Sequence, residues 1–303
     1  MIYFSGPLEI IQILSQANPF FILLGVFIWF FDSLLRTLRW QILLKKINIS
    51  IPFLDAWQIM IASMFISNLS PAKTGDPVRS LILKKTNKKS FSKSLPSIII
   101  ERISDIIILI IICFIGLLFV SSTIPQISYW FYLSLFVYAG IFLSFLYFIT
   151  NPKKMETFLS KILSLFSFIP QTKKYAKKIN YFSNILSSTF SKYKSLPTIT
   201  YSFILTSFIW MAQSFILLIS FYSLGISVPL WYCLLAISLS VLIGILTFLP
   251  GTIGSSEFIT VLFFTSFLSL APSQITSAVI IQRLLSFGIY VSLGAIIFSY
   301  KFK

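Results

Sequence analysis

The residues that could bind a charged group stand out against a strongly apolar background. Of the 303 residues, 57% are hydrophobic and 11% are charged. Between Lys194 and Lys301 the sequence contains two charged residues, Glu257 and Arg283. Burying one charge in a bilayer costs about 2.5–3.5 kcal/mol on insertion scales, so such residues usually pair or face a polar cavity. These two residues are therefore candidates for a functional site.

A second group of polar residues interrupts an apolar run in the stretch LSPAKTGDPVRS, residues 69–80. A proline ends one helical limb and a glycine permits the turn. The limb that follows begins with free N–H groups and a positive dipole end, which bind phosphates and carboxylates. The candidate binding residues here are Lys73, Thr74, Gly75, Asp76 and Arg79.

A matching stretch, LPGTIGSSE at 249–257, follows the same pattern in the second half of the chain. Pro71 and Gly75 have the spacing of Pro250 and Gly254. Hydroxyl groups of Thr74, Thr252, Ser255 and Ser256 could add donors at the two tips. Further along, Glu101–Arg102 corresponds to Gln282–Arg283. The candidates from these segments are Gly251, Thr252, Gly254, Ser255 and Glu257 with Arg283, and Glu101 with Arg102.

Each of these charges also has a purely structural interpretation. Asp76 could cap the helix that follows it, and Glu257 with Arg283 could lock two helices together. The expected counterpart of the Glu257–Arg283 pair in the first half is Asp76 with Arg102. Glu101 or Asp105 lies nearby in the sequence. On the first long helix, Asp32 and Arg36 are four residues apart and are expected to pair locally.

Composition excludes several kinds of site. The sequence has no histidine, the usual general base and metal ligand. Cys113 and Cys233 lie in separate apolar runs and are interpreted as packing residues. We therefore predict no catalytic residue, no metal and no cofactor. The net charge of +16 would suggest nucleic acid in a soluble protein. Here the lysines flank apolar spans, so membrane orientation explains the charge better, and no nucleic-acid partner is expected.

The apolar runs predict an all-α, polytopic integral membrane protein. Residues 1–18 predict a short interfacial helix, 19–44 a first spanning helix and 95–120 another. An apolar run at 127–150 predicts a linking helix, and the lysine-rich 151–194 a basic amphipathic segment on a membrane surface. The remaining apolar helices are expected near 198–222, 230–249, 255–270 and 274–300.

The distribution of lysine and arginine predicts the orientation. The basic clusters 36–46, 73–93 and 153–194 and the C-terminal KFK are expected in the cytoplasm, with the N-terminus outside. Residues 52–70 must then enter the membrane and return. The returning limb, from Gly75 to Leu83, is too short to cross. The segment 52–85 is therefore predicted to be a re-entrant hairpin with its tip inside the bilayer.

The paired signals predict an internal duplication within a single transmembrane domain, residues 1–303. FIWFFDS (27–33) matches FIWMAQS (208–214), and ISIP matches ISVP before each hairpin. The first repeat covers 19–120 and the second covers 198–300. The expected orientation makes the repeats inverted, with the second hairpin, 230–270, entering from outside and the two tips approaching each other. Inverted repeats with broken helices near the midplane are typical of transporters.

Four stretches carry a family resemblance: LSPAKTGDPVRS, SLPSIIIERISD, LPGTIGSSE and QRLLS. Together they resemble the lysylphosphatidylglycerol synthase transmembrane, flippase-like family over residues 19–300. In its bifunctional members this membrane domain moves an aminoacylated lipid, and a separate soluble domain makes that lipid. The sequence ends at Lys303, so we expect a stand-alone member without the synthase domain. Other stand-alone members are linked to polyprenyl-lipid and glycolipid pathways.

Three functions are open at this stage. The first is a flippase-like transporter in the cell membrane for a lipid with an anionic headgroup, such as a phospholipid or a polyprenyl phosphate. The second is a membrane-embedded enzyme such as a lipid-linked glycosyltransferase, although no carboxylate pair in a polar loop and no nucleotide-binding motif is present. The third is a non-transporting scaffold for lipid-pathway enzymes. Membrane lipids, lipid-biosynthesis enzymes and further copies of the chain are the expected partners.

Overall fold

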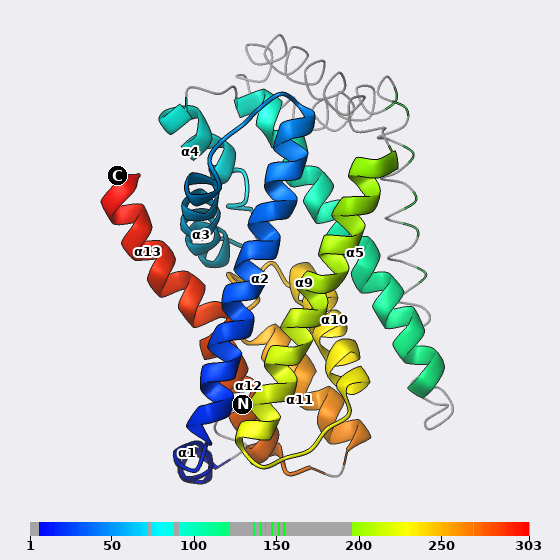
Figure 1. The fold of residues 1–303 in the computed structure, drawn as a ribbon. Coiled ribbons are helices and arrows are strands. Elements are labelled where there is room, and N and C mark those ends of the chain that lie inside the picture. The colour runs from blue at the N-terminus through cyan, green and yellow to red at the C-terminus, as the bar shows by residue number, and fades with distance from the viewer. Residues whose placement is uncertain are drawn as a thin grey trace, which may run out of the picture.

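The computed structural model is built from helices in every part of the chain that it describes (Figure 1). It describes residues 6–71, 74–87, 91–120, 196–268 and 270–302, and six single residues between 136 and 154. The predicted linking helix (127–150) and basic segment (151–194) lie outside the described residues, apart from those single positions. A short helix, α1 (Pro7–Ser15), precedes the first long one, which agrees with the predicted N-terminal helix.

Among the described residues, three helical stretches are long and apolar enough to cross a membrane: Pro19–Lys46, Pro197–Ser223 and Pro272–Lys301. The first is α2 (Pro19–Lys46) and the second belongs to α9 (Leu196–Ser223). The third joins α12 (Pro272–Arg283), a π-helical turn η2 (Leu284–Gly288) and α13 (Ile289–Lys301). Large apolar side chains such as Phe27 of α2 and Phe208 of α9 are exposed, as a lipid-facing surface requires. The chain is therefore an all-α polytopic membrane protein.

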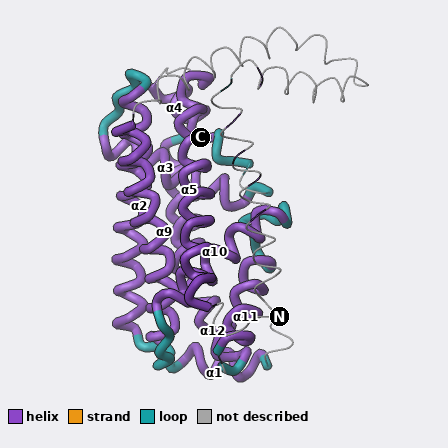
Figure 2. The backbone as a smooth tube through the Cα atoms, turned by 90° about the vertical axis from the view of Figure 1, so that its right-hand side faces the viewer, coloured by secondary structure: helices purple, strands orange, loops and turns teal. Residues whose placement is uncertain are grey.

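Two hairpins of shorter helices lie between these long elements. The first joins α3 (Phe53–Leu69) to α4 (Val78–Asn87), and the second joins α10 (Leu230–Leu246) to α11 (Ser255–Phe267). Helices α3 and α10 have 17 residues each, which is about 26 Å of helix. In Figures 1 and 2, α3 and α4 occupy one end of the molecule and α10 and α11 the other. Each hairpin thus reaches only part of the way along the long axis.

The tips of the two hairpins meet. Pro71 and Pro250 pair as an isolated antiparallel β-bridge, which brings the first tip against the second. Gly251, at a φ of 58°, lies so close to the first hairpin that a Cβ there would come within 2.7 Å of the Asn68 carbonyl oxygen. A side chain at this position would force the tips apart. The predicted approach of Pro71 and Pro250 is therefore confirmed.

The two halves exchange their packing partners. Helix α3 packs against α13 from the other half, while α10 packs against α5 (Phe91–Val120). Both contacts are close because a glycine lies in them. A Cβ at Gly294 would meet Phe65 at 2.6 Å, and a Cβ at Gly116 would meet Leu235 at 3.0 Å. Small residues at helix contacts let membrane helices approach closely.

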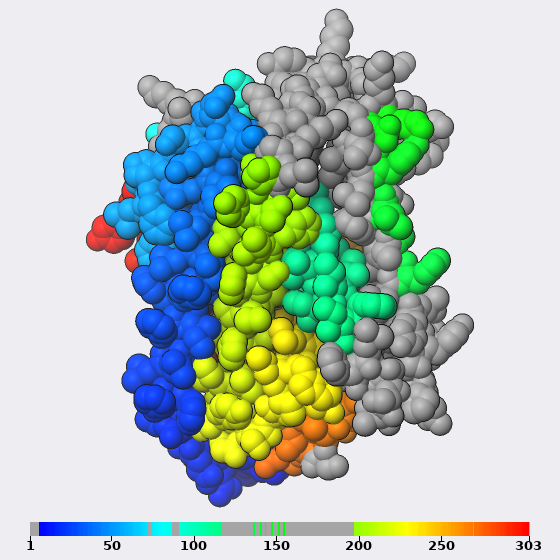
Figure 3. Space-filling model, turned by 45° about the vertical axis from the view of Figure 1, so that its right-hand side comes forward, coloured from blue at the N-terminus to red at the C-terminus, as the bar shows by residue number. Residues whose placement is uncertain are grey.

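The long helices α2 and α9 form the shared centre of the molecule. They pack along one another, and Figure 3 shows α2, α9 and α5 side by side on one face. In Figure 1, α2 runs from the lower end to the upper end and α9 runs the other way. The bounds of these helices agree with the sequence predictions to within a few residues. The side chains of the site project from this pair and from the two tips.

Candidate functional site

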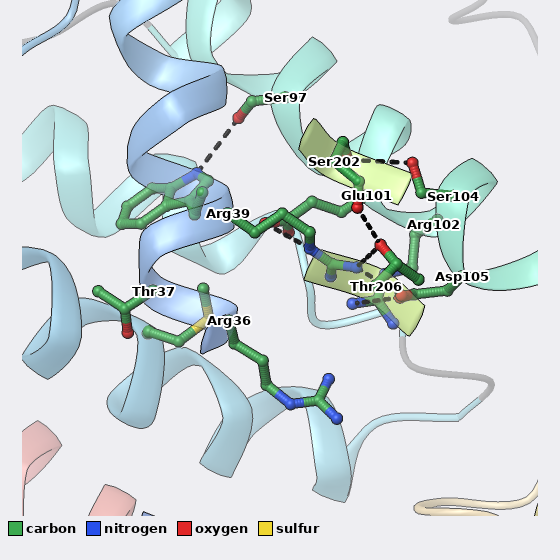
Figure 4. Close-up of polar contacts among 12 residues, drawn as sticks. Arg36, Thr37, Arg39, Ser97, Glu101, Arg102, Ser104, Asp105, Ser202 and Thr206 are labelled. Carbon is green, nitrogen blue, oxygen red and sulfur yellow. Dashed lines mark hydrogen bonds and ion pairs between the residues drawn. The ribbon is translucent and has the colours of Figure 1, made fainter. Parts of the chain in front are cut away.

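A buried network of charges surrounds Arg39 in the middle of α2. Its guanidinium lies 2.6 Å from Asp105 and 3.6 Å from Glu101, both on α5. It also donates to Thr206 of α9 at 2.7 Å. Figure 4 shows Arg39 reaching between these helices. The arginine is almost fully buried, so it ties α2, α5 and α9 together through charge-assisted hydrogen bonds.

Arg79 of α4 extends the same network. It contacts Glu101 at 2.5 Å and lies 4.9 Å from the centre of the Trp40 ring. Glu101 is fully buried and Arg79 nearly so. Both were predicted to be binding residues, but neither lines either of the two cavities described below. Their geometry is that of a buried pair holding α4 to α5.

Arg102 and Asp76 pair as predicted, and they close the first hairpin. Arg102 lies 3.3 Å from Asp76 and 3.2 Å from Asp105. Asp76 also accepts a hydrogen bond of 2.5 Å from Ser67, which is on the opposite limb of the hairpin. The carboxylate therefore joins α3, the tip and α5, a larger role than capping α4 alone.

A cavity of about 430 Å³ lies beside this pair. Its charged lining residues are Asp76, Arg102 and Asp105, which sum to −1, and Thr74 adds a hydroxyl group. The rest of the lining is mostly apolar. Its volume lies within the range of ligand sites, about 300–1,000 Å³, but its charge does not favour an anion. We refer to it as the apolar cavity; its apolar lining residues are Pro77, Leu95, Ile98, Ile99, Ile106, Leu109, Trp210, Val241 and Ile245.

At the second tip, Glu257 and Arg283 pair as predicted. Arg283 Nε lies 2.6 Å from the Glu257 carboxylate. The other carboxylate oxygen accepts from the backbone N–H of Gly254 at 2.7 Å. Arg283 also donates to the hydroxyl groups of Ser256 and Thr252. The N–H of Gly254, directly before α11, is thus occupied by Glu257 of the same helix.

A second cavity, of about 100 Å³, lies against this pair. Its charged lining residues are Arg36, Glu257 and Arg283, which sum to +1. The π-helical turn η2 begins directly after Arg283 and contributes Ser286 and Phe287. Such turns are frequent at functional sites. We refer to it as the charged cavity; its remaining polar lining residues are Asn68, Gln213, Ser240, Thr252, Ser256, Thr260, Gln282 and Tyr290.

Asp32 organises the wall of the charged cavity on α2. One of its oxygens accepts from Arg36 Nε at 2.9 Å, from Gln213 at 3.0 Å and from Tyr290 at 2.8 Å. These donors come from three helices, α2, α9 and α13. The predicted Asp32–Arg36 pair is confirmed, and its carboxylate is fully buried. Asp32 does not line the cavity itself, but its hydrogen bond holds the lining residue Arg36 in position.

Trp210 and Val241 line both cavities and so form the wall between them. The matched places of Arg102 and Arg283 in the two halves of the sequence predict that both face one central cavity near the tips. The structure places Arg102 on the apolar cavity and Arg283 on the charged cavity, so that expectation is wrong. Trp210, a large buried side chain, lies between the two cavities because it lines both.

Several tip residues act differently from the prediction. Gly254 has a φ of 86° and does permit the turn. Gly75 is needed for a close approach instead: a Cβ there would lie 2.9 Å from the Ile66 carbonyl oxygen. Gly251, Thr252 and Glu257 line the charged cavity, whereas Gly254 and Ser255 do not. Lys73 lies outside the described residues.

Sequence reasoning missed the roles of Arg36 and Arg39. Both were assigned to a cytoplasmic basic cluster, 36–46, together with Lys45 and Lys46. The structure buries both arginines and leaves the two lysines exposed in the last turn of α2. The helical spacing carried a signal: Asp32 and Arg36 form an i,i+4 pair within an apolar helix, where a charge rarely points to lipid.

No group of three or more potential metal ligands occurs among the described residues.

Comparison with known proteins agrees with this architecture. The profile of the lysylphosphatidylglycerol synthase TM region matches residues 1–294, so the chain belongs to that family. A UPF0104 membrane protein of Methanothermobacter thermautotrophicus is 24% identical, over 97% of this chain and 89% of the relative. UPF0104 membrane proteins of Pyrococcus horikoshii and Methanocaldococcus jannaschii are 25% and 24% identical, over 98% and 97% of this chain and 92% and 88% of the relatives.

The Arg39 network predicts a large loss of stability when its central cation is removed. After Arg39→Gln, Arg79 still pairs with Glu101 and Arg102 with Asp105, but the buried network carries one uncompensated negative charge, which costs about 3–5 kcal/mol. Unfolding of the detergent-solubilised protein by a denaturing detergent measures this loss. Lys45→Gln, on the exposed end of the same helix, is the control and should change stability by less than about 0.5 kcal/mol. An Arg39→Gln protein as stable as the control would contradict the structural role assigned to the network.

Proposed function

We propose that this protein is a flippase-like transporter that moves a lipid with an anionic headgroup across the membrane. The observation that carries the proposal is the meeting of the two hairpin tips beside a small charged cavity. Non-helical backbone at membrane depth is tolerated where protein or a polar cavity satisfies it. Transporters place their sites at such breaks. A headgroup could pass the tips while its apolar tails stay in the surrounding lipid.

We also propose that the two halves form an inverted repeat with re-entrant hairpins. The opposite directions of α2 and α9 (Figure 1) support this, as do the hairpins at opposite ends of the molecule. The exchanged packing of α3 with α13 and of α10 with α5 has the reciprocity expected of a duplicated chain. In such an arrangement the tips are the natural place for alternating access.

The sign of the headgroup follows from the lining of the two cavities. The charged cavity carries two arginines and one glutamate, whereas the apolar cavity carries two aspartates and one arginine. An anion is therefore stabilised beside the second tip and repelled beside the first. A phospholipid and a polyprenyl phosphate both present the required charge. The two alternatives from the sequence, a lipid-linked glycosyltransferase and a scaffold for lipid-pathway enzymes, require no translocation.

In the proposed orientation, the lysine-bearing end of the molecule faces the cytoplasm and the N-terminus lies outside the cell. In Figure 1 the C-terminal ends of α2, α4 and α13 and the start of α5 lie at the same end. These helix ends carry lysines, as the positive-inside rule requires of a cytoplasmic face. The lysines concerned are Lys45, Lys46, Lys84, Lys85, Lys93 and Lys301.

This orientation predicts the labelling of a cysteine placed at Lys84, an exposed residue of α4. In a background with Cys113 and Cys233 replaced by alanine, Lys84→Cys should resist a membrane-impermeant thiol reagent applied to intact cells. It should react after the cells are permeabilised. Reaction in intact cells would show that the lysine-bearing end faces outside and would contradict the orientation.

Reconstitution into liposomes tests the transport proposal. The native protein should speed the translocation of a fluorescent phosphatidylglycerol more than that of a zwitterionic phosphatidylcholine. Arg283→Leu should reduce the rate at least tenfold, because the charged cavity loses half of its positive lining. Arg283→Lys should restore part of the rate, since lysine keeps the charge but cannot make a forked contact. Lys45→Gln is the matched control and should translocate like the native protein.

Glu257→Gln separates the structural role of the second pair from a transport role. If the carboxylate only neutralises Arg283 and holds the Gly254 N–H, this change should lower stability more than it lowers transport. If Glu257 carries a coupled proton or cation, transport should fail in a protein of native stability. Folded Arg283→Leu and Glu257→Gln proteins that both translocate lipid normally would leave the pair as a helix lock and would refute the transport mechanism.

A further inference from the structure

Arg36 of α2 is held by Asp32 and Tyr290, and these two contacts leave part of its guanidinium for another partner. Arg36 forms one ion pair, through Nε to Asp32 at 2.9 Å. Its side chain also forms a hydrogen bond with Tyr290. A guanidinium has five N–H donors, so some of those on the two Nη groups are left for another partner.

These donors face the charged cavity. Arg36 lines that cavity although its side chain is only 8% exposed. Figure 4 shows its guanidinium extending away from the Arg39 network, with no contact to the other residues drawn. Leaving buried donors of a charged group unpaired costs more than leaving neutral ones. The geometry therefore points to a ligand with acceptor oxygens in the cavity.

Asp32 makes this orientation of Arg36 rigid. Its carboxylate accepts three hydrogen bonds from three helices, and Arg36 Nε is one of the donors. The same arrangement occurs across the cavity, where Glu257 binds Nε of Arg283. Arg283 also donates hydrogen bonds through Nη2 to the hydroxyl groups of Ser256 and Thr252 at the second tip. Arg36 is thus held in place by Asp32 through Nε, while the rest of its guanidinium lines the cavity.

We propose that Arg36 is the residue that binds the headgroup, and that the group it binds is a phosphate. A guanidinium offers parallel N–H donors that match two oxygens of a phosphate. The cavity, about 100 Å³, has the volume of roughly three water molecules, which suits a phosphate group but not a whole headgroup. Arg283 supplies the second positive charge, and the Asn68 amide lies on the same wall. This assignment rests on the proposed function for its lipid, but binding is measurable without transport.

Binding to the detergent-solubilised full chain tests the assignment. The probes are inorganic phosphate, short-chain phosphatidic acid, short-chain phosphatidylglycerol and a diacylglycerol of the same chain length, each titrated by calorimetry. At least one phosphate-bearing probe should bind, and diacylglycerol should not. Tighter binding of the lipids than of inorganic phosphate identifies a lipid headgroup as the source, and the reverse order identifies free phosphate.

Arg36→Gln should weaken binding of the phosphate-bearing probes at least tenfold, and Arg36→Lys should retain part of it. Lys45→Gln removes an equal charge from the exposed end of α2 and should bind like the native protein. Loss of binding in Lys45→Gln to the same degree would mean a general charge effect and would overturn the assignment. So would a folded Arg36→Gln protein whose affinity stays within twofold of the native value.

A second variant keeps the test valid if Arg36→Gln does not fold, because that change leaves Asp32 as an unpaired buried charge. The double variant Asp32→Asn, Arg36→Gln removes both charges and should fold yet fail to bind phosphate; phosphate binding by this variant would overturn the assignment.

Translocation by the same proteins separates the two proposals. Arg36-dependent binding without translocation by the native protein would refute the transport function alone. Translocation that does not depend on Arg36 would refute this inference alone.

Discussion

The fold depends on one constraint: two helical hairpins end inside the molecule, and their broken backbones need partners. At the first tip, the Ser70 hydroxyl accepts a hydrogen bond from the N–H of Gly75, and the Asp76 carboxylate accepts one from the Ser67 hydroxyl. At the second, Glu257 accepts from the N–H of Gly254. The tips also lie against each other at the bridge between Pro71 and Pro250. In hydrocarbon each unsatisfied group would cost several kcal/mol, so the contacts within each tip stabilise its broken backbone.

The charges that hold this arrangement are distributed in two groups along α2. Arg39 faces the network of α4 and α5, while Arg36, about one turn away, faces the charged cavity. The first group is almost entirely buried and its acids and bases compensate each other. The second leaves donors open to the cavity. One helix therefore anchors the scaffold with one arginine and places the other on the proposed binding cavity.

Much of this fold was predictable because isolated charges and helix breakers are conspicuous in an apolar sequence. The pairs Asp76–Arg102 and Glu257–Arg283 were predicted from the cost of a lone intramembrane charge, and both form. The meeting of the tips was predicted from the matched Pro71 and Pro250. The Asp32–Arg36 pair was also predicted and forms. The place of Arg36 on the charged cavity and the network of Arg39 were missed because, beside Lys45 and Lys46, the two arginines look like part of an ordinary cytoplasmic cluster.

Other features depend on contacts that local sequence does not encode. The hydrogen bond from Arg39 to Thr206 joins residues 167 positions apart. Trp210 divides the space into two cavities, and its place in the wall follows from how α9 packs against both halves. The inverted orientation of the repeats stays a prediction, as do the roles of 127–150 and 151–194.

Cross-linking of the tips tests the central claim most directly. In a protein with Cys113 and Cys233 replaced by alanine, Pro71→Cys and Pro250→Cys should form a disulfide on mild oxidation. The residues of an antiparallel bridge lie about 4.5–5.5 Å apart, within the range of a disulfide. The account predicts efficient cross-linking and a loss of lipid translocation that reduction reverses. Failure to cross-link, or full translocation by the cross-linked protein, would contradict it.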